Sequence, residues 1–353
     1  MSTIDYAPLS APVTREEARA FRRESRARSG GLLSGGIVAV IALVVGVVGG
    51  AAALLVVIAL GVAVWTAPGG PDGGMVLLTL ALLVVLGLTA WGIVAGTVGT
   101  LGTWSRWLRL TRFATANRMT FSASSPDPRY PGAIFTVGRD RRAVEHLRST
   151  EGRYVDFGNY RYVTGSGKNQ TTHHWGFLAL KLDRRLPHMV LDARSNNGLF
   201  GATTLPTAFS RDQVLSLEGD FDRHFTLYCP AEYERDALYV FTPDLMALLI
   251  DEAAPYDVEI VDDWMFVYSP TRFPPADEAT YRRLFRIVDT VGAKTVAQTG
   301  RYADDRAGVD RTANLVAPQG RRLKRGISAG AVVFIVVFVL GFVWNLVGGA
   351  FGY

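Results

Sequence analysis

Residues Met75 to Leu101 read MVLLTLALLVVLGLTAWGIVAGTVGTL and contain no charged side chain. A helix that crosses the hydrocarbon core of a bilayer needs about 20 mostly apolar residues, so this stretch is long enough for one tilted span. Two further runs, Gly30 to Thr66 and Ile327 to Val347, are also uncharged and rich in apolar residues. The sequence therefore predicts three transmembrane α-helices.

Charge is distributed very unevenly along the 353 residues. Between Arg28 and Arg106 the only charged residue is Asp72, and from Gly326 onward there is none. The other 248 residues carry 68 of the 69 charges, a density typical of soluble domains. A single soluble globule is thus excluded, and the sequence indicates a soluble domain between membrane segments.

The first two apolar runs are joined by APGGPDGG, residues 67 to 74, which favours a tight reversal and so a helical hairpin. The first run is too long for one untilted span, which leaves one long helix or two short helices. Two helices would place Arg28 and Arg106 on opposite sides of the membrane. We therefore prefer a single long helix there.

Basic residues lie before the first apolar run, after the second and before the third, which three spans would place on one side of the membrane. Neither the hairpin loop nor the C-terminal tail contains Lys or Arg. By the positive-inside rule, the N-terminus and the soluble domain are cytoplasmic, the C-terminus is outside, and the protein is a multi-pass inner-membrane protein. The basic clusters beside the domain can also attract anionic lipid headgroups. The candidate headgroup contacts are Arg106, Arg109, Arg112, Arg321, Arg322, Lys324 and Arg325.

The chain thus divides into five expected parts. They are a basic cytoplasmic tail (1–29), a transmembrane hairpin (30–104), a cytoplasmic α+β domain (105–298), a flexible tether (299–326) and a C-terminal transmembrane helix (327–353). The tether is predicted because residues 300 to 320 are polar and lack periodicity.

Within the soluble part, strand-like segments at 154–163 and 174–182 flank a loop, and in the second Leu178, Leu180 and Leu182 share one face at period 2. Other expected elements are a short strand at 133–137, a turn at 184–187, a strand at 221–228, and a hairpin whose turn is Asp262-Asp263. Thr242 followed by Pro243 predicts a helix start. A helix from about Ala276 to Val296 is indicated by apolar residues at helical spacing. The fold class expected is an α+β domain, with helices packed on an antiparallel sheet, combined with three transmembrane helices.

The stretch from Phe221 to Tyr268 resembles a family of uncharacterised bacterial membrane proteins that contain a domain of unknown function. The resemblance is carried by Gly-Asp-Phe-Asp-Arg-His-Phe, by Ala237-Leu238, by Phe-Thr-Pro-Asp-Leu-Met at 241–246, and by the segment that ends at Tyr268. It implies an N-terminal membrane hairpin before an α+β domain, and it implies no activity and no site residues. The third apolar run departs from the simplest layout of that family.

Two short motifs resemble nucleotide-handling sequences and lack the residues that would complete them. Gly165 to Lys168 lacks both the earlier glycine and the following Ser or Thr of a phosphate-binding loop. Asp156-Phe157-Gly158 has neither a catalytic-loop His-Arg-Asp nor a strand lysine to accompany it. A hairpin loop and an ordinary strand explain them better.

The remaining side-chain chemistry is sparse. His173 or His174 could bind a metal only with a distant His188 or His224, and no acidic or cysteine partner is spaced for it. Cys229 and His224 are expected to face opposite ways on a strand, which disfavours a nucleophile and its base. A turn explains Asp262-Asp263 better than a catalytic carboxylate pair does. Asn169-Gln170-Thr171 matches a glycosylation acceptor, but it lies on the expected inner side.

No catalytic, cofactor or metal site is therefore predicted. The favoured function is a non-catalytic, membrane-tethered module for binding or scaffolding. Its expected partners are the lipid bilayer, anionic headgroups and an unknown protein. The alternatives are a membrane-surface enzyme with a site built from distant residues and, more weakly, a transport component. Only four of the 37 basic residues are lysines, a bias expected of a GC-rich genome, and many of the arginines lie beside the apolar runs. The number of arginines is therefore not evidence of nucleic-acid binding, and no nucleic-acid partner is expected. Gly46 and Gly50 have the spacing of close helix packing, so a homo-oligomer stays open.

Overall fold

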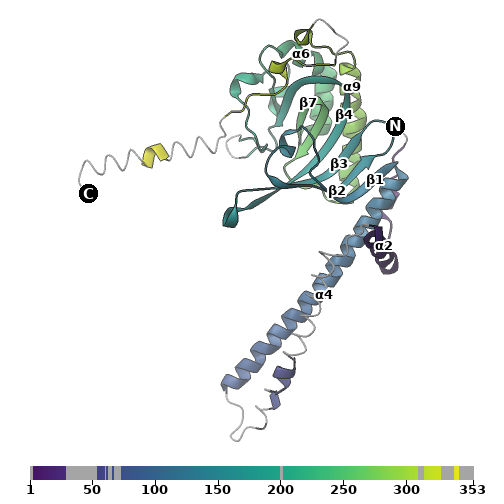
Figure 1. The fold of residues 1–353 in the computed structure, drawn as a ribbon, viewed down its shortest axis with the longest axis vertical. Helices are drawn as coiled ribbons and strands as arrows, with labels where there is room; N and C mark the ends of the chain where they lie inside the picture. The colour runs from purple at the N-terminus through teal and green to yellow at the C-terminus, as the bar shows by residue number, and fades with distance from the viewer. Residues whose placement is uncertain are drawn as a thin grey trace, which may run out of the picture. The chain divides into compact units, whose positions relative to one another are not determined.

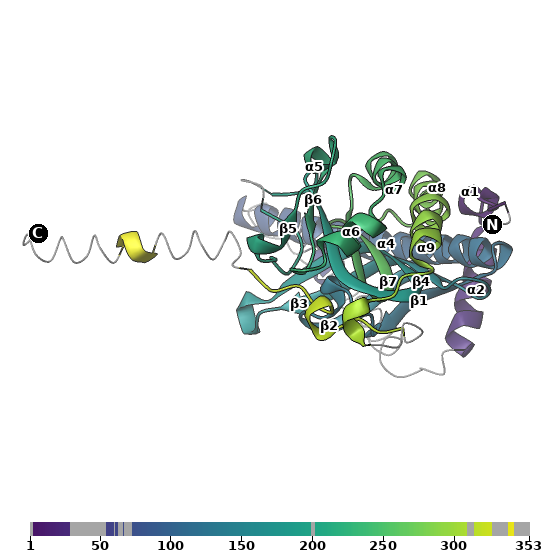
Figure 2. The ribbon, with the colours of Figure 1, turned by 90° about the horizontal axis from the view of Figure 1, so that it is seen from above.

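The computed structural model describes residues 3–28, 54–59, 61–62, 66, 73–198, 202–308, 314–326 and 338–341. The chain forms two compact units (Figures 1 and 2). One comprises Met1–Ser10 and Leu110–Tyr353, and the other comprises Ala11–Arg109.

The smaller unit contains α2 (Arg15–Arg28) and most of α4 (Gly73–Ala116). Thr14 and Glu17 form a capping box at the start of α2, in which each side chain accepts from the other's backbone N–H, at 2.8 and 3.2 Å. Phe21 of α2 packs edge-on against Trp104 of α4, with ring centroids 6.2 Å apart. This contact joins the basic tail to the part of α4 that follows the second apolar run.

Apolar side chains project from the first half of α4. Leu77, Val84 and Leu88 are 70%, 61% and 61% exposed. Taken over the described residues alone, no helix has both the length and the hydropathy needed to cross a membrane. The first and third apolar runs lie mostly outside the described residues, so the three predicted spans stay predictions.

The larger unit is built on a seven-stranded sheet whose described strand pairs are all antiparallel. The strands are β1 (Met119–Pro126), β2 (Arg139–Ser149), β3 (Val155–Thr164), β4 (Thr171–Ala193), β5 (Val214–Leu215), β6 (Phe225–Tyr228) and β7 (Asp257–Ser269). The central strand is β4, which pairs with β7 along one side. On its other side β4 pairs first with β3 and then with β6.

One face of the sheet is covered by α8 (Glu278–Ile287), a π-helical turn (Val288–Gly292) and α9 (Ala293–Thr299). Phe157 of β3 packs edge-on against Tyr281 and Phe285 of α8, with centroids 5.3 and 5.4 Å apart. The Asp277 side chain caps α8 by accepting from the Thr280 N–H at 2.8 Å. This continuous helix and the α+β class are confirmed.

The opposite face is covered by irregular segments. The connector after β1 contains the 3-10 turn η1 (Ala133–Phe135), and Phe135 packs edge-on against Tyr160 with centroids 4.6 Å apart. Leu323, near the end of the described C-terminal segment, belongs to the same core cluster. The expected short strand at 133–137 is thus wrong, because this segment buries its apolar residues as a helical turn.

The other named elements are short. They are α1 (Ala7–Ser10), η2 (Gly167–Asn169), η4 (Arg211–Gln213), α5 (Phe221–His224), α6 (Glu234–Val240), α7 (Pro243–Leu248), a second π turn (Leu249–Ala253), η7 (Asp305–Ala307) and η8 (Pro318–Gly320). The helix after Thr242 begins where the sequence predicts. The Thr242 hydroxyl, however, is buried without a hydrogen-bond partner among the described residues, so it does not cap the helix.

Two expected reversals are β-bulges within continuous strands. The hairpin predicted at Asp262-Asp263 is wrong, because β7 runs through these residues and pairs with β4 on both sides of them. Asp262 has a φ of 53°, which kinks the strand without reversing it. The turn predicted at 184–187 is also wrong, since β4 continues there with shifts in register.

Two other predictions are corrected. The strand expected at 221–228 is one helical turn, α5, followed by β6. The described parts of the segment expected as a flexible tether, 299–308 and 314–326, pack on the domain: Tyr302, Val316 and Leu323 are each less than 8% exposed. The sequence of this segment lacks periodicity because isolated apolar residues, and not one face of a regular helix or strand, pack on the domain.

Candidate functional site

A cleft of about 790 Å³ opens where the connector after β1, the bulged part of β7 and the C-terminal segment meet. We call it the arginine cleft, because it is lined by Arg129, Arg141, Arg185, Arg321 and Arg322. Asp127, Asp262 and Asp263 are its acidic residues. The bulges explain the position of the cleft, since Leu186 of β4 is paired with Asp262 of β7 at the irregular register.

Two of the five guanidinium groups are neutralised by carboxylates of the cleft. Arg141 lies 3.0 Å from Asp127, and Arg322 lies 2.8 Å from Asp262. The third carboxylate, Asp263, is paired outside the arginine set, with Lys181 at 2.8 Å. Asp262 and Asp263 therefore each form an ion pair with a basic side chain, and they do not form a catalytic carboxylate pair.

The other three arginines give the cleft its positive charge. Arg321 Nε donates to the Val316 carbonyl at 2.8 Å, which orients the group without neutralising it. Arg129 and Arg185 are exposed, and no carboxylate within the described ranges pairs with either. A guanidinium presents several N–H donors in a planar fork that suits carboxylate and phosphate oxygens.

The predicted headgroup contacts fall into separate places. Arg321 and Arg322 line the arginine cleft. Arg106, Arg109 and Arg112 lie on α4, and each already has an interaction partner. Lys324 and Arg325 are exposed where the chain runs beside residues 209 to 213.

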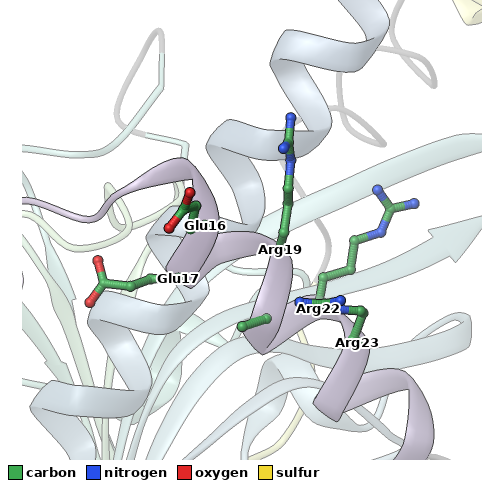
Figure 3. Close-up of a pocket in the computed structure, with 6 residues that line it drawn as sticks. Glu16, Glu17, Arg19, Arg22 and Arg23 are labelled. Carbon is green, nitrogen blue, oxygen red and sulfur yellow. The ribbon is translucent and has the colours of Figure 1, made fainter.

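A second basic surface lies on α2, in the smaller unit. A shallow pocket there is lined by residues of this one helix (Figure 3). Glu16 and Glu17 lie in its first turn, and Arg19, Arg22 and Arg23 follow further along. This order of charge suits the helix dipole, so helix stability explains much of the pattern.

Asp156, which is fully buried, lies at the centre of a polar network on β3. Its Oδ1 lies 2.7 Å from His146 Nδ1, and its Oδ2 accepts from Tyr130 Oη at 2.5 Å and from Arg148 at 3.0 Å. Burial opposes ionisation of Asp156, but the hydrogen bonds from His146 and Tyr130 and the charge of Arg148 outweigh it and lower its pKa. The carboxylate is thus held ionised.

This network continues to a serine on the edge strand. Ser125 Oγ lies 2.8 Å from His146 Nε2. With Asp156 accepting at Nδ1, the imidazole presents an acceptor nitrogen to the hydroxyl, the order of groups that activates a serine nucleophile. Sequence reasoning missed His146 and Ser125, because their partners lie on neighbouring strands and only the strand register brings them together.

A second buried network joins β4, β7 and the two irregular segments. Glu259 Oε1 accepts from His188 Nε2, and Glu259 Oε2 accepts from Tyr268 Oη and from the Ala133 N–H, each at 2.7 Å. His188 Nδ1 accepts from the Leu323 N–H at 3.0 Å. The His188 ring thus links Glu259 of β7 to the C-terminal segment.

The histidines considered for a metal are separated in the fold. His173 stacks on Tyr162 and lies 2.7 Å from Thr164 Oγ1, while His174 contacts Arg272. Across the described residues, no group of three or more His, Cys, Asp or Glu side chains is arranged to hold a metal ion.

Two other sequence candidates have ordinary explanations. Cys229 is buried, and burial raises the pKa of its thiol to about 12, so the thiolate needed for nucleophilic chemistry is scarce at neutral pH. Gly165 to Lys168 lies in the connection between β3 and β4, as expected of a hairpin loop.

Similarity to known proteins is limited. No family model matches the chain, and no curated protein matches it. Among solved structures, the crystal structure of the mycobacterial trehalose monomycolate transport factor A, TtfA, is similar over 53% of this chain and 94% of that chain. The identity is 16% and the TM-score is 0.34.

Proposed function

We propose that this protein is a membrane-anchored, non-catalytic module whose α+β domain binds an anionic group in the arginine cleft. The observation that carries the proposal is that Arg129 and Arg185, which line the same cleft as Arg321, have no carboxylate partner among the described residues. Guanidinium groups left without carboxylates beside three neutralised or oriented neighbours favour an anionic ligand.

Membrane anchoring rests on the three apolar runs and on α4. Exposed apolar side chains such as Leu77 and Val84 are unfavourable in water by about 25 cal/mol per Å² of apolar surface. Trp104 and Trp107 follow the apolar part of α4, and aromatic residues of this kind favour the boundary between lipid and water. With three spans, the N-terminus and the domain are cytoplasmic and the C-terminus is outside.

The anion of this proposal is the headgroup of an anionic phospholipid. The arginine cleft is lined by Arg321 and Arg322, which come shortly before the third apolar run in the sequence. A phosphodiester offers oxygens to two guanidinium groups at once, which a neutral headgroup does not. A soluble phosphate compound shares this chemistry, and a binding comparison distinguishes the two sources.

The test uses the full-length protein in a neutral detergent. Binding of phosphatidylglycerol, of phosphatidylcholine and of inorganic phosphate is measured for the wild type and for the double variant Arg129→Gln/Arg185→Gln. We expect the wild type to prefer phosphatidylglycerol and the variant to bind it about 10-fold or more weakly, since each charge-assisted hydrogen bond is worth roughly 1.5–3 kcal/mol.

The matched control is Arg194→Gln/Arg211→Gln, which removes two exposed arginines outside the cleft. It should bind like the wild type. A soluble ligand is indicated if inorganic phosphate binds as tightly as the lipid does. Equal losses in both double variants would show that only net charge matters, and the cleft would lose its role.

A second candidate function is hydrolysis at the membrane surface, with Ser125 as the nucleophile. One observation favours it, namely the chain of hydrogen bonds from Ser125 through His146 to the buried, ionised Asp156. In this function His146 would accept the Ser125 proton as Ser125 Oγ attacks an ester or amide carbonyl, and it would give that proton to the departing alcohol or amine. Water would then hydrolyse the acyl-serine, and Asp156 would orient the imidazole throughout.

This candidate predicts that the wild type reacts covalently with a fluorophosphonate probe and that Ser125→Ala abolishes the reaction. His146→Gln should also abolish it, because the base is lost. The neighbouring Ser124→Ala serves as the control and should keep full labelling. A folded wild-type protein that takes up no probe would exclude the hydrolase and leave the binding module as the only proposal.

A further inference from the structure

The helix α2 packs one side against α4 and leaves its other side exposed. Ala18 is 1% exposed, and Phe21 is half-buried against Trp104. Trp104 in turn packs edge-on against Trp107, with ring centroids 4.9 Å apart. Both tryptophans follow the apolar part of α4, and aromatic residues favour the boundary between lipid and water. The contact with Trp104 therefore holds α2 beside the part of α4 that suits this boundary.

The exposed side of α2 carries arginines that lie about one helical turn apart. Arg15, Arg19 and Arg23 follow one another at intervals of four residues, and all three are exposed. Like charges at this spacing destabilise a helix. The helix dipole favours basic residues within the last turn, which contains none of these three. Helix stability thus explains the acidic first turn of α2 and not its exposed arginines.

The guanidinium groups beside the pocket on α2 are not neutralised within the part of the chain that the structure describes. Arg19, Arg22 and Arg23 line this pocket, and no ion pair joins them to the carboxylates of the first turn. Figure 3 shows Glu16 and Glu17 directed away from Arg22 and Arg23. Arg22 is half-buried, and its Nε is buried with no hydrogen-bond partner among the described residues. A buried donor without an acceptor is unfavourable, so these arginines favour an anionic ligand.

We propose that α2 binds the headgroup layer of an anionic bilayer, with Arg19, Arg22 and Arg23 contacting the lipid phosphates. This inference rests on the proposed membrane anchoring by α4 and is independent of the arginine cleft. The contact between Phe21 and Trp104 places the three arginines where the apolar part of α4 ends, which is the depth of the headgroups for a spanning helix. Each arginine beside an anionic surface strengthens binding about 5-fold, so three together contribute about 100-fold.

An acidic protein would offer carboxylates to the same arginines. The bilayer is favoured because α2 and α4 belong to one compact unit, and a spanning α4 keeps lipid phosphates at a high effective concentration beside α2. A soluble partner has no such advantage and must be recruited from solution. Because Arg19 and Arg23 are exposed, their attraction to the bilayer is screened by salt.

The experiment uses the full-length protein in nanodiscs, with a fluorophore attached to the variant Ala20→Cys. Ala20 is exposed and lines the pocket on α2 beside Arg19. Cys229 is buried, so the label reacts at position 20. The discs contain phosphatidylcholine, either alone or mixed with phosphatidylglycerol, and a lipid that carries a nitroxide quencher on its headgroup.

Quenching of the label should be at least about 3-fold stronger in the discs that contain phosphatidylglycerol, and the difference should shrink as salt is added. The variant Arg19→Gln/Arg22→Gln/Arg23→Gln should show equal quenching in the two kinds of disc. Its α2 is expected to stay helical, because glutamine has a helix propensity close to that of arginine. The variant with lysine at the same three positions retains the charge and should keep most of the preference.

Two controls separate this surface from the rest of the molecule. Arg194→Gln/Arg211→Gln/Arg235→Gln removes three exposed arginines outside α2 and should behave like the wild type. The cleft variant Arg129→Gln/Arg185→Gln should also keep the preference, so a failure of the cleft proposal leaves this one standing.

Two results would overturn the inference about α2. One is equal quenching of the wild type in both kinds of disc, and the other is a glutamine variant that keeps the preference. Protein that does not insert into either kind of disc would contradict the proposed anchoring itself.

Discussion

Replacing Glu259 by Ala is expected to lower the free energy of unfolding by about 3–5 kcal/mol. Glu259 is 1% exposed and accepts from three buried donors: His188 Nε2, Tyr268 Oη and the Ala133 N–H. Each buried donor left without an acceptor costs about 1–3 kcal/mol, and the loss of the side chain also leaves a cavity.

The measurement is denaturant unfolding of the full-length protein in detergent, followed by tryptophan fluorescence. Glu218→Ala is the control, since Glu218 is exposed, and it should change the free energy of unfolding by less than about 0.5 kcal/mol. If Glu259→Ala unfolds at the same denaturant concentration as the wild type, the network does not hold the connector and the C-terminal segment on the sheet.

Replacing Asp156 by Asn should destabilise the domain by about 2–4 kcal/mol at neutral pH and by much less in acid. The substitution removes the negative charge that His146, Tyr130 and Arg148 stabilise. Because the pKa of Asp156 is lower in the folded protein than in the unfolded chain, its ionisation stabilises the fold above the unfolded pKa of about 4. That contribution is lost as the pH falls through the lower, folded pKa.

The difference between wild type and variant should therefore shrink as the pH is lowered below about 4. Free energies of unfolding at several pH values would measure it. Asp183→Asn is the control, because Asp183 is exposed and its pair with Arg153 is worth about 1 kcal/mol or less. A difference that does not change with pH would mean that Asp156 is not ionised in the folded state.

Elements with a regular pattern could be predicted from the sequence. The helix from Glu278 onward buries one periodic face, and the sequence shows that periodicity directly. The strands β3 and β4 are buried on both faces over most of their length, and they could be predicted as long runs of strand-forming residues on either side of a loop. The bulge at Asp262 could not be distinguished from a turn, because Asp tolerates the positive φ that both can require. The C-terminal segment was predicted to be a flexible tether because its buried residues, such as Val316 and Leu323, are isolated in a polar stretch and produce no periodic pattern.

The candidate site was predicted only in part. Arg321 and Arg322 were expected to bind anions because they form a basic cluster, and the structure places both in the arginine cleft. Arg129 and Arg185 gave no such signal, since each comes from a segment far away in the sequence. The Asp156 and Glu259 networks depend on strand register, which one sequence does not determine.

The central claim, a domain anchored on the cytoplasmic side by three spans, is tested most directly by membrane topology. A reporter inserted after Gly167, in the exposed connection between β3 and β4, leaves the buried C-terminal segment intact, and a second reporter follows Tyr353. The account predicts cytoplasmic activity for the first reporter and external activity for the second. External activity of the reporter after Gly167, or both reporters on the same side, would contradict it.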